Sequence, residues 1–333
     1  MAARLREMLV ERGLEGKVKI HHFHEWCGEQ LRLYNLPKPA SGPDYISQLE
    51  KAVISAVENG SIPRGQYGAL MVDEGHDFEQ KWLELIVGMV DPETNNFLLL
   101  YDDAQSIYAK RSSLGFSLSS VGIHARGRTT ILKLNYRNTS EVLNFAQRFA
   151  RQYMDLGDGN GEDLPLIKPE AVGKHGPMPA VKVLDSYEQE ARYIVNVLKQ
   201  LNKTRSASWS SMCVTYRSKA MGRVLHRILC EASLPCEWLN SVAAKRGLRL
   251  SIDTIKLMTM HGSKGLEFPI VVVSGVGNMP AKNADAVAEA KLLYVAMTRS
   301  TDKLLITADK DSEFVTALLA GDEGLEEARA AGF

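Results

Sequence analysis

Pairs of acidic residues follow two apolar runs of the sequence, and carboxylates at such places can bind a metal ion. Asp73 and Glu74 follow the run GALMV, and Asp102 and Asp103 follow the run FLLLY. Adjacent carboxylates at the end of a buried strand suit a Mg²⁺–phosphate site, because one can hold the metal and its neighbour can activate a water. A solvated turn between strand and helix, capped by an Asp, is the alternative. These residues alone leave both interpretations open.

Cationic and aromatic residues elsewhere could contact a nucleotide. The segment 259–268 (TMHGSKGLEF) holds glycines that let the backbone approach a ligand, and Lys264 could meet a phosphate. It is not a phosphate-binding loop of the form GxxxxGKS/T, because Gly265 follows the lysine. Tyr136 beside Arg137 could stack on a purine and grip a phosphate. Alternatively, the ring covers the core edge and the arginine is solvated.

Short apolar runs between helical segments must position these residues. In the first half the runs lie at 18–23, 68–74, 97–103 and 129–135, and each is continuous rather than alternating. Such runs are typical of strands buried on both faces of a parallel sheet, with helices as crossovers. Ligands bind such sheets beyond the carboxyl ends of the strands, where the acidic pairs fall.

The second half repeats this α/β rhythm. We predict strands in AVKVLD, SMCVTYR, TIKLMTM, FPIVVVSG and KLLITAD, and helices at 187–201, 221–232 and 284–298. Arg299 follows the last of these helices, where an arginine is usually a surface charge that complements the helix dipole. The Gly- and Pro-rich stretch 156–179 indicates a linker or a long surface loop.

Length, composition and charge narrow the class of protein. A chain of 333 residues favours two domains, and 45% hydrophobic residues argue against disorder. The 40 Lys and Arg residues balance 40 Asp and Glu residues, which excludes a strongly basic bulk charge but not a local basic groove. The four cysteines form no CxxC pair, and no apolar run reaches the roughly 18 residues of a membrane span. We expect a reduced, cytoplasmic protein.

Six segments resemble, in order, the motifs of the UvrD/Rep-like superfamily 1 helicases. VKIHHFHEWC is similar to the TFHS motif (Ib), VDEGHDF to motif II (usually DEAQDF), and LLYDDAQSIY to motif III (usually GDxxQSIY). LKLNYRNTSEVLNFA is similar to motif IV (LxxNYRS), IKLMTMHGSKGLEFPIVVV to motif V (xTIHxSKGLEF), and KLLYVAMTRSTDKLLIT to motif VI (RLLYVALTRAxxxLxI). The resemblance covers nearly the whole chain.

The resemblance implies an α/β fold of two tandem RecA-like domains, of the P-loop NTPase type, with mainly parallel sheets. The partial first domain would span 1–134, with motifs Ib, II and III, and the second domain 135–333, with motifs IV, V and VI. ATP and Mg²⁺ are the implied cofactors. In the first domain Asp73 would bind Mg²⁺, Glu74 would activate the attacking water, and Gln105 would sense the γ-phosphate.

In the second domain the resemblance implies a set of nucleotide contacts. Tyr136 would stack on the adenine, and Arg137 would contact the γ-phosphate. Glu267 would touch the sugar region of the nucleotide, in a loop that Gly265 shapes. Arg299 would stabilise the charge that develops in the transition state.

The implied activity is that of an ATP-dependent translocase or helicase that moves 3′→5′ along single-stranded DNA. Its substrate would be a single strand or a 3′-tailed duplex. Residues along the DNA groove would stack on bases or bind phosphates, and they are Phe23, His24, Tyr108 and His261.

The sequence also departs from the family pattern. No GxxxxGKS/T loop occurs in it, which predicts an N-terminally truncated helicase whose ATP hydrolysis alone is very weak or absent. The first sheet would lack central strands, so we expect an uncovered apolar surface that binds a protein partner or a second copy. Motif II carries Gly75 and His76 in place of Ala and Gln.

Two alternatives remain beside the helicase interpretation. The chain could be a non-catalytic remnant of a helicase that binds DNA or docks onto a protein. His21, His22, His24 and Cys27 could instead form a metal site, although no second ligand pair lies at zinc-finger spacing.

Overall fold

The computed structural model describes residues 8–14, 16–101, 116–130, 134–153, 170–171, 173–204, 207–240 and 252–320. Contacts divide the chain into two units, Met1–Thr129 and Thr130–Phe333, close to the predicted domain boundary at residue 134. Every strand pair in the described residues is parallel. The predicted α/β fold with mainly parallel sheets is therefore confirmed.

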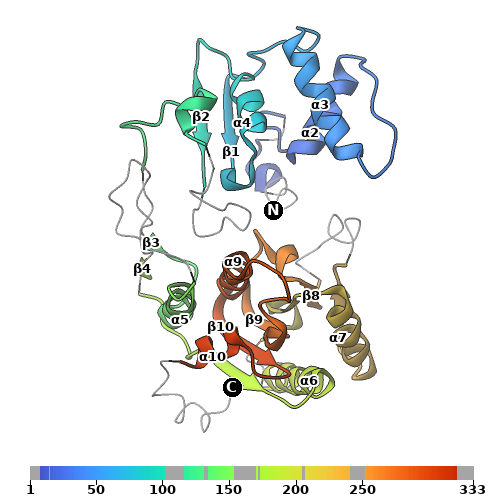
Figure 1. Cartoon of the computed structure of the whole chain (residues 1–333), viewed down its shortest axis with the longest axis vertical. Helices are drawn as coiled ribbons and strands as arrows, with labels where there is room; N and C mark the ends of the chain where they lie inside the picture. Colours follow the sequence, from blue (N-terminus) through green and yellow to red (C-terminus); the bar gives the residue numbers. More distant parts are fainter. Residues whose placement is uncertain are drawn as a thin grey trace. The chain divides into compact units, whose positions relative to one another are not determined.

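The first unit packs helices against a small parallel sheet (Figure 1). Strand β1 (Ala69–Val72) pairs with β2 (Asn96–Leu99). The helices are α2 (Phe23–Leu33), α3 (Tyr45–Glu58) and α4 (Gln80–Val87), with short 3₁₀ turns η1 (Gly75–Asp77) and η3 (Leu118–Val121). Apolar side chains at helical spacing build the core, among them Trp26, Leu31, Leu49, Val53, Leu83 and Ile86.

The β1–β2 sheet has one covered face and one exposed face. Leu70, Val72, Phe97 and Leu99 point into the core, because successive side chains of a strand alternate between faces. On the other face Met71 is 70% exposed, and Leu98 and Leu100 are exposed beside it. These three exposed side chains lie in the domain for which an uncovered apolar surface is expected, and the binding of a partner there stays a prediction.

The predicted strand at 18–23 is wrong. Residues 18–22 form no strand, and Phe23 begins helix α2. Buried Trp26, Cys27, Gln30 and Leu31 recur at helical spacing, so the segment buries one face as a helix. The apolar run that predicted a strand is short, and the helical pattern that follows it is stronger.

The second unit contains a six-stranded parallel sheet in the order β5-β10-β9-β6-β8-β7. Its strands are β5 (Ala180–Val183), β6 (Met212–Tyr216), β7 (Cys236–Trp238), β8 (Ile255–Thr259), β9 (Phe268–Ser274) and β10 (Ser300–Ala308). A separate short pair joins β3 (Leu134–Asn135) to β4 (Glu170–Ala171). The predicted strands of this half are all present, while β7 was not predicted.

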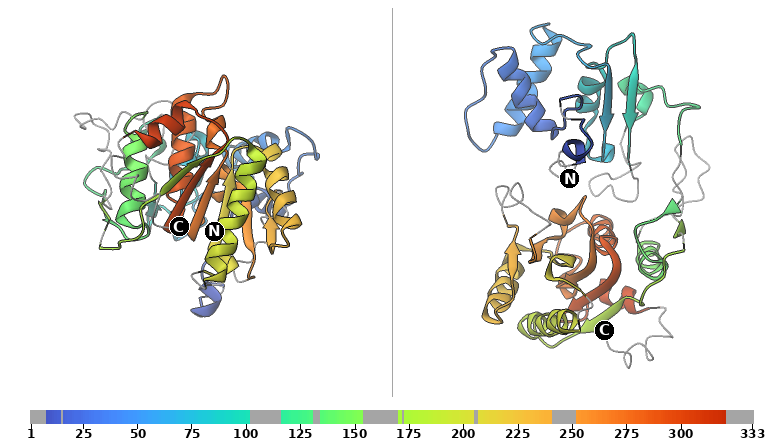
Figure 2. Two further views of the ribbon diagram at one scale, coloured as in Figure 1. Left: turned by 90° about the horizontal axis from the view of Figure 1, so that it is seen from below. Right: turned by 180° about the vertical axis from the view of Figure 1, so that it is seen from behind.

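Helices cover both faces of this sheet (Figure 2). On one face lie α6 (Tyr187–Lys203) and α7 (Lys219–Glu231), packed on alternate residues of the central strands. On the other lie α5 (Ser140–Ala150), α9 (Ala286–Met297) and α10 (Glu313–Leu319), with short turns η4 (Trp209–Ser211), η5 (Met260–Ser263) and η6 (Val276–Asn278) between elements. Burial on both faces explains the continuous apolar runs.

Side-chain caps fix where these five helices begin. A hydroxyl or carboxylate oxygen at each N-cap accepts a hydrogen bond from a backbone N–H of the first turn, as is common for Ser, Thr and Asp. The caps are Thr139, Ser186, Ser218, Asp285 and Ser312. Among the residues that the structure describes, no helix is long and apolar enough to cross a membrane.

Candidate functional site

A tight turn after β3 presents Tyr136 and Arg137. The Asn135 Oδ1 accepts hydrogen bonds from the backbone N–H groups of Arg137 (2.9 Å) and Asn138 (3.1 Å). Such a turn stiffens the segment by the side chain's own bonds to the backbone. Tyr136 is 68% exposed, so its ring is available to stack on a flat ligand.

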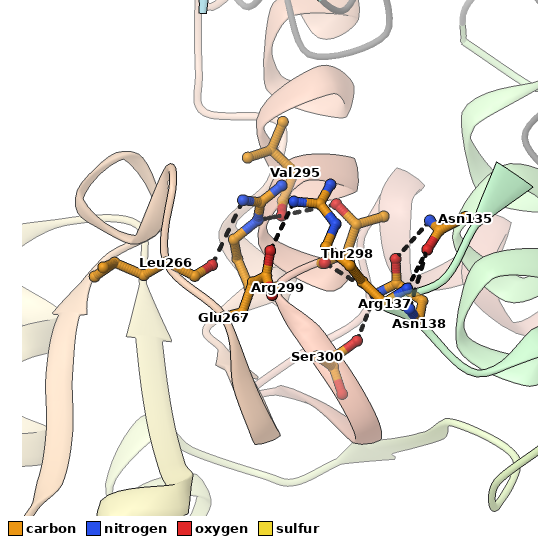
Figure 3. Close-up of polar contacts among 9 residues, drawn as sticks. All are labelled: Asn135, Arg137, Asn138, Leu266, Glu267, Val295, Thr298, Arg299 and Ser300. Carbon is orange, nitrogen blue, oxygen red and sulfur yellow. Dashed lines mark hydrogen bonds and ion pairs between the residues drawn. The ribbon is translucent and has the colours of Figure 1, made fainter. Parts of the chain in front are cut away.

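The turn contacts the loop that precedes β9. Arg137 Nη1 lies 2.7 Å from Glu267 Oε1, although the two residues are far apart in the sequence. Gly265 has a φ of 75°, a left-handed conformation that glycine adopts without steric cost. This glycine lets the loop bend so that Glu267 faces the arginine (Figure 3).

Arg299 lies beside this pair, between α9 and β10. It is 1% exposed and is among the largest fully buried side chains of the described residues. Its Nε donates to the Val295 carbonyl at 3.0 Å, and its Nη1 donates to the Leu266 carbonyl at 3.5 Å. The sequence alone favoured a solvated helix-end charge, whereas the structure buries this arginine.

Asn138 joins the same segments, and sequence reasoning did not select it. Its side chain is 1% exposed. The Nδ2 donates to the carbonyls of Thr298 (3.0 Å) and Ser300, and Oδ1 accepts from Asn135 Nδ2 at 2.8 Å. Its place next to Arg137 in motif IV is the only signal that the sequence offered.

In the first unit Asp73 and Glu74 lie directly after β1. The Asp73 Oδ1 accepts from the Glu74 backbone N–H at 3.0 Å. Glu74 has a φ of 55°, a conformation that is rare for a residue with a side chain and often marks a functional position. His76 is buried, and its Nε2 lies 3.1 Å from Glu74 Oε2.

Gly75, the glycine of motif II, lies tightly packed against the end of β2. The backbone N–H of Gly75 donates to the Leu100 carbonyl at 2.8 Å, which ties the turn to the end of β2. A Cβ at this position would lie 2.4 Å from a methyl carbon of Leu99. The alanine usual in the family would therefore not fit without movement of that leucine.

Phe23 and His24 belong to an aromatic cluster. The Phe23 ring stacks on Trp82 with centroids 4.8 Å apart, and the His24 ring meets Trp82 edge-on at 5.2 Å. Phe78 contacts both Phe23 and Trp82. His24 Nε2 also lies 2.7 Å from Glu50 Oε1. Sequence reasoning did not select Trp82, whose helix α4 follows motif II.

The remaining predicted residues are His261 and two residues outside the described part of the chain. His261 is exposed in η5, directly after β8. Gln105 and Tyr108 lie outside the described residues.

The alternative metal site has an unfavourable donor set. Burial raises the pKa of Cys27 to about 12, with the nearby Glu50 adding to the effect, whereas a metal ligand must be a thiolate. His21 lies 3.2 Å from Glu29, and His24 contacts Glu50. In the part of the chain that the structure describes, no three His, Cys, Asp or Glu side chains form a metal-binding group. A Mg²⁺ ion held by one carboxylate, water and phosphate needs no such group.

Comparison with known families decides the relationship. Residues 130–243 and 241–311 match the UvrD-like helicase C-terminal domain, which is more than half of the 333 residues. The chain belongs to the UvrD-like helicase family. The predicted resemblance to the UvrD/Rep-like helicases is thus confirmed.

Several relatives of this UvrD-like chain are DNA helicases by name. DNA helicase II of Escherichia coli K12 is 28% identical over 176 residues, which are 52% of this chain and 23% of that protein. A probable DNA helicase of Mycoplasma pneumoniae is 25% identical over 250 residues, or 72% of this chain and 43% of that protein. The chain therefore matches about a quarter of the first relative's length and less than half of the second's.

One solved structure gives a weaker likeness to the UvrD-like chain. The C-terminal domain of a possible DNA helicase from Lactobacillus plantarum WCFS1 has a TM-score of 0.40 and 19% identity. The alignment covers 55% of this chain and 94% of that domain.

The UvrD-like match contains the whole group around Arg137. Tyr136, Arg137, Glu267 and Arg299 all lie within residues 130–311. Asp73, Glu74 and the aromatic cluster lie outside the matched segments. The roles of the residues in both groups stay predictions.

Proposed function

We propose that this chain belongs to an ATP-dependent translocase or helicase that moves 3′→5′ along single-stranded DNA. Family membership supports this, because the relatives that the chain resembles are named DNA helicases. The observation that carries the proposal is the group formed by Arg137, Glu267 and Arg299. Three segments distant in sequence contribute two guanidinium groups to one region of the second unit.

Guanidinium groups suit the phosphates of ATP. Their planar donors bind phosphate oxygens in pairs, and a half-exposed Arg137 can reach a ligand. The exposed ring of Tyr136 suits adenine stacking, and Glu267 suits contact with the sugar hydroxyls. Arg299 would stabilise charge on the phosphates from its buried place, with little reorganisation.

The carboxylates of the first unit suit Mg²⁺ and water activation. Asp73 is exposed and would hold the ion together with water and phosphate oxygens. Glu74 would accept the proton of the attacking water, and His76 lies close enough to orient its carboxylate. Gln105 is proposed to sense the γ-phosphate.

The proposed partner is single-stranded DNA or a 3′-tailed duplex. Phe23, His24, Tyr108 and His261 would stack on bases or bind phosphates, which lets a chain with zero net charge hold a single strand. The contacts between Phe23, His24 and Trp82 present partly buried rings from two helices.

Nucleotide binding tests the group around Arg137. A fluorescent ATP analogue with Mg²⁺ is titrated into the wild-type chain and the Arg137→Ala variant. We expect the variant to lose at least about tenfold in affinity, since a charge-assisted bond contributes about 1.5–3 kcal/mol. Arg227→Ala is the matched control, because Arg227 is an equally exposed arginine on α7 that pairs with Glu188 and Glu231. Equal affinity of both variants would contradict the proposed nucleotide site.

DNA binding and hydrolysis test the rest. We expect a fluorescent oligothymidine to bind, and the affinity to fall as salt rises. ATP hydrolysis by the chain alone is expected to stay very weak even with DNA, because the sequence has no GxxxxGKS/T loop. DNA binding without nucleotide binding would favour the alternative, a non-catalytic DNA-binding or protein-docking module. Robust DNA-stimulated hydrolysis would contradict the expected weakness.

A further inference from the structure

Asn138 is a buried amide with its polar atoms engaged on both sides. Its amide nitrogen donates to the carbonyls of Thr298 and Ser300, and its oxygen accepts from Asn135. The two carbonyls belong to the residues on either side of Arg299 (Figure 3). One side chain therefore holds the backbone immediately before and immediately after the buried arginine.

The two arginines are linked in a closed ring of contacts. Arg137 directly precedes Asn138 and pairs with Glu267. Leu266, the neighbour of Glu267, accepts a hydrogen bond from Arg299. The Asn138 side chain closes the ring, because it donates to the carbonyl of Thr298, next to Arg299, and Asn138 itself follows Arg137 in the chain. Displacement of the backbone at one arginine must therefore disturb the other.

An asparagine side chain matches the hydrogen-bond partners at this position. Two carbonyl oxygens require two donors, and the Asn135 amide requires an acceptor, which is the inventory of an asparagine side chain. A serine, usual here in the motif IV pattern LxxNYRS, has one hydroxyl donor. An aspartate would place a carboxylate against two carbonyl oxygens, and burial makes that arrangement unfavourable.

A second side chain also links the segment that holds Arg137 to the segment that follows Arg299. Lys174 Nζ donates to the carbonyls of Arg137 (3.4 Å) and Thr301. It is exposed, so its contribution is smaller than that of the buried amide.

We propose that Asn138 is a positioning residue that sets the spacing of Arg137 and Arg299 and thereby their joint grip on a phosphate chain. This rests on the proposed nucleotide site. Asn138 itself contacts no ligand in this proposal. It acts through the backbone of both arginines, so its loss changes their geometry and not their number.

The first experiment needs no nucleotide. In the ¹⁵N-labelled full chain, the Arg299 Nε–H is buried and bonded to the Val295 carbonyl, so it exchanges slowly with water. In Asn138→Ala we expect its exchange to accelerate about tenfold, a coupling typical of one hydrogen-bond network. Asn202→Ala is the control. Asn202 lies near the end of α6, and its part-buried amide donates to the Ala207 carbonyl in the loop that follows. Unchanged exchange in a folded Asn138→Ala chain would overturn the proposal.

The second experiment measures affinity for a fluorescent ATP analogue with Mg²⁺. Asn138→Ala is expected to weaken binding about tenfold in the wild-type background but less than about twofold with Arg137→Ala, because residues that act together are not additive. Fully additive losses would overturn the positioning role. No binding by the wild-type chain would overturn the proposed nucleotide site, while the exchange result still decides the role of Asn138. Should Asn138→Ala not fold, Asn138→Ser retains one donor and is expected to give intermediate exchange, and wild-type exchange would overturn the proposal.

Discussion

A buried arginine is the residue that sequence reasoning described least well. Burial of a guanidinium is unfavourable unless its donors find acceptors. For Arg299 these include the carbonyls of Val295, one helical turn earlier, and Leu266, in a distant loop. The second acceptor depends on how that loop crosses the sheet. A helix-end pattern in the sequence holds no information about it, whereas motif VI selected the same residue by resemblance.

Because the Tyr136 ring is exposed, its replacement is expected to change nucleotide affinity without changing the stability of the fold. We expect Tyr136→Ala to weaken binding of the fluorescent ATP analogue about fivefold to tenfold, since stacking on an aromatic ring contributes about 1 kcal/mol or more. The melting temperature should stay unchanged, because the ring is 68% exposed. Tyr136→Phe keeps the ring and should bind like the wild type. A loss in both variants would show that the hydroxyl, and not stacking, matters.

At Glu190 we predict a pH-dependent stability. This residue of α6 is fully buried, and its Oε1 accepts from Ser274, Gly275 and Thr307. Burial raises the pKa of its carboxyl despite these hydrogen bonds, so the neutral form is favoured more in the folded chain than in the unfolded chain. Its stabilising contribution is present below the unfolded pKa and is lost as the pH rises through the folded pKa.

Replacement by the neutral isostere tests this prediction. Glu190→Gln should match the wild type in unfolding free energy near the acid limit of folding, to within about 1 kcal/mol. It should be the more stable protein at neutral and higher pH. Denaturant titrations at several pH values measure both. Glu188→Gln, exposed on the same helix, should keep the wild-type slope. If the unfolding free energy of Glu190→Gln depended on pH as steeply as that of the wild type, the predicted role of Glu190 would be contradicted.

At the scale of elements, the sequence predicted the second unit better than the first. Its strands are apolar on both faces, and caps begin five of its helices, so periodicity and capping agree. The strand predicted at 18–23 was wrong because a run of six residues cannot distinguish a strand from the residues that lead into a helix. Strand β7, only three residues long, carries too little pattern to detect.

The aromatic cluster joins helices α2 and α4, and we predict that Trp82 supports DNA binding. Trp82→Ala removes the ring against which Phe23 and His24 pack, and should cost about 2–4 kcal/mol in unfolding free energy. Affinity for a single-stranded oligothymidine should fall at least about threefold at a temperature where the variant is folded. Trp209→Ala, a partly buried tryptophan of the second unit, should leave DNA affinity unchanged. Equal loss in both would indicate general destabilisation.

At the scale of the whole molecule, an exposed sheet face predicts association with a second copy. Met71, Leu98 and Leu100 form an apolar surface on the β1–β2 sheet, and such surfaces bind partners. We expect the sedimentation coefficient of the chain to rise with concentration, and Met71→Glu to suppress the rise. Ile46→Glu is the control, because Ile46 is a singly exposed residue of α3. A wild-type chain that stays monomeric at all concentrations would contradict this prediction.

The connection between β8 and β9 has a mechanical consequence. Thr259 and Ser274 both pair with Tyr216, so β9 starts about 20 Å back along the strand direction and roughly 10 Å to the side. Residues 260–267 span this distance, although such crossovers usually need about a dozen residues. The four residues of η5 advance only about 2 Å each, and the rest at most about 3.5 Å, so little slack remains. The segment also contains a turn at Lys264 and Gly265, closed by a hydrogen bond from the Leu266 backbone N–H to the Ser263 carbonyl, which shortens its reach further. We therefore expect a shift of His261 at one edge of the sheet to displace Glu267 at the other.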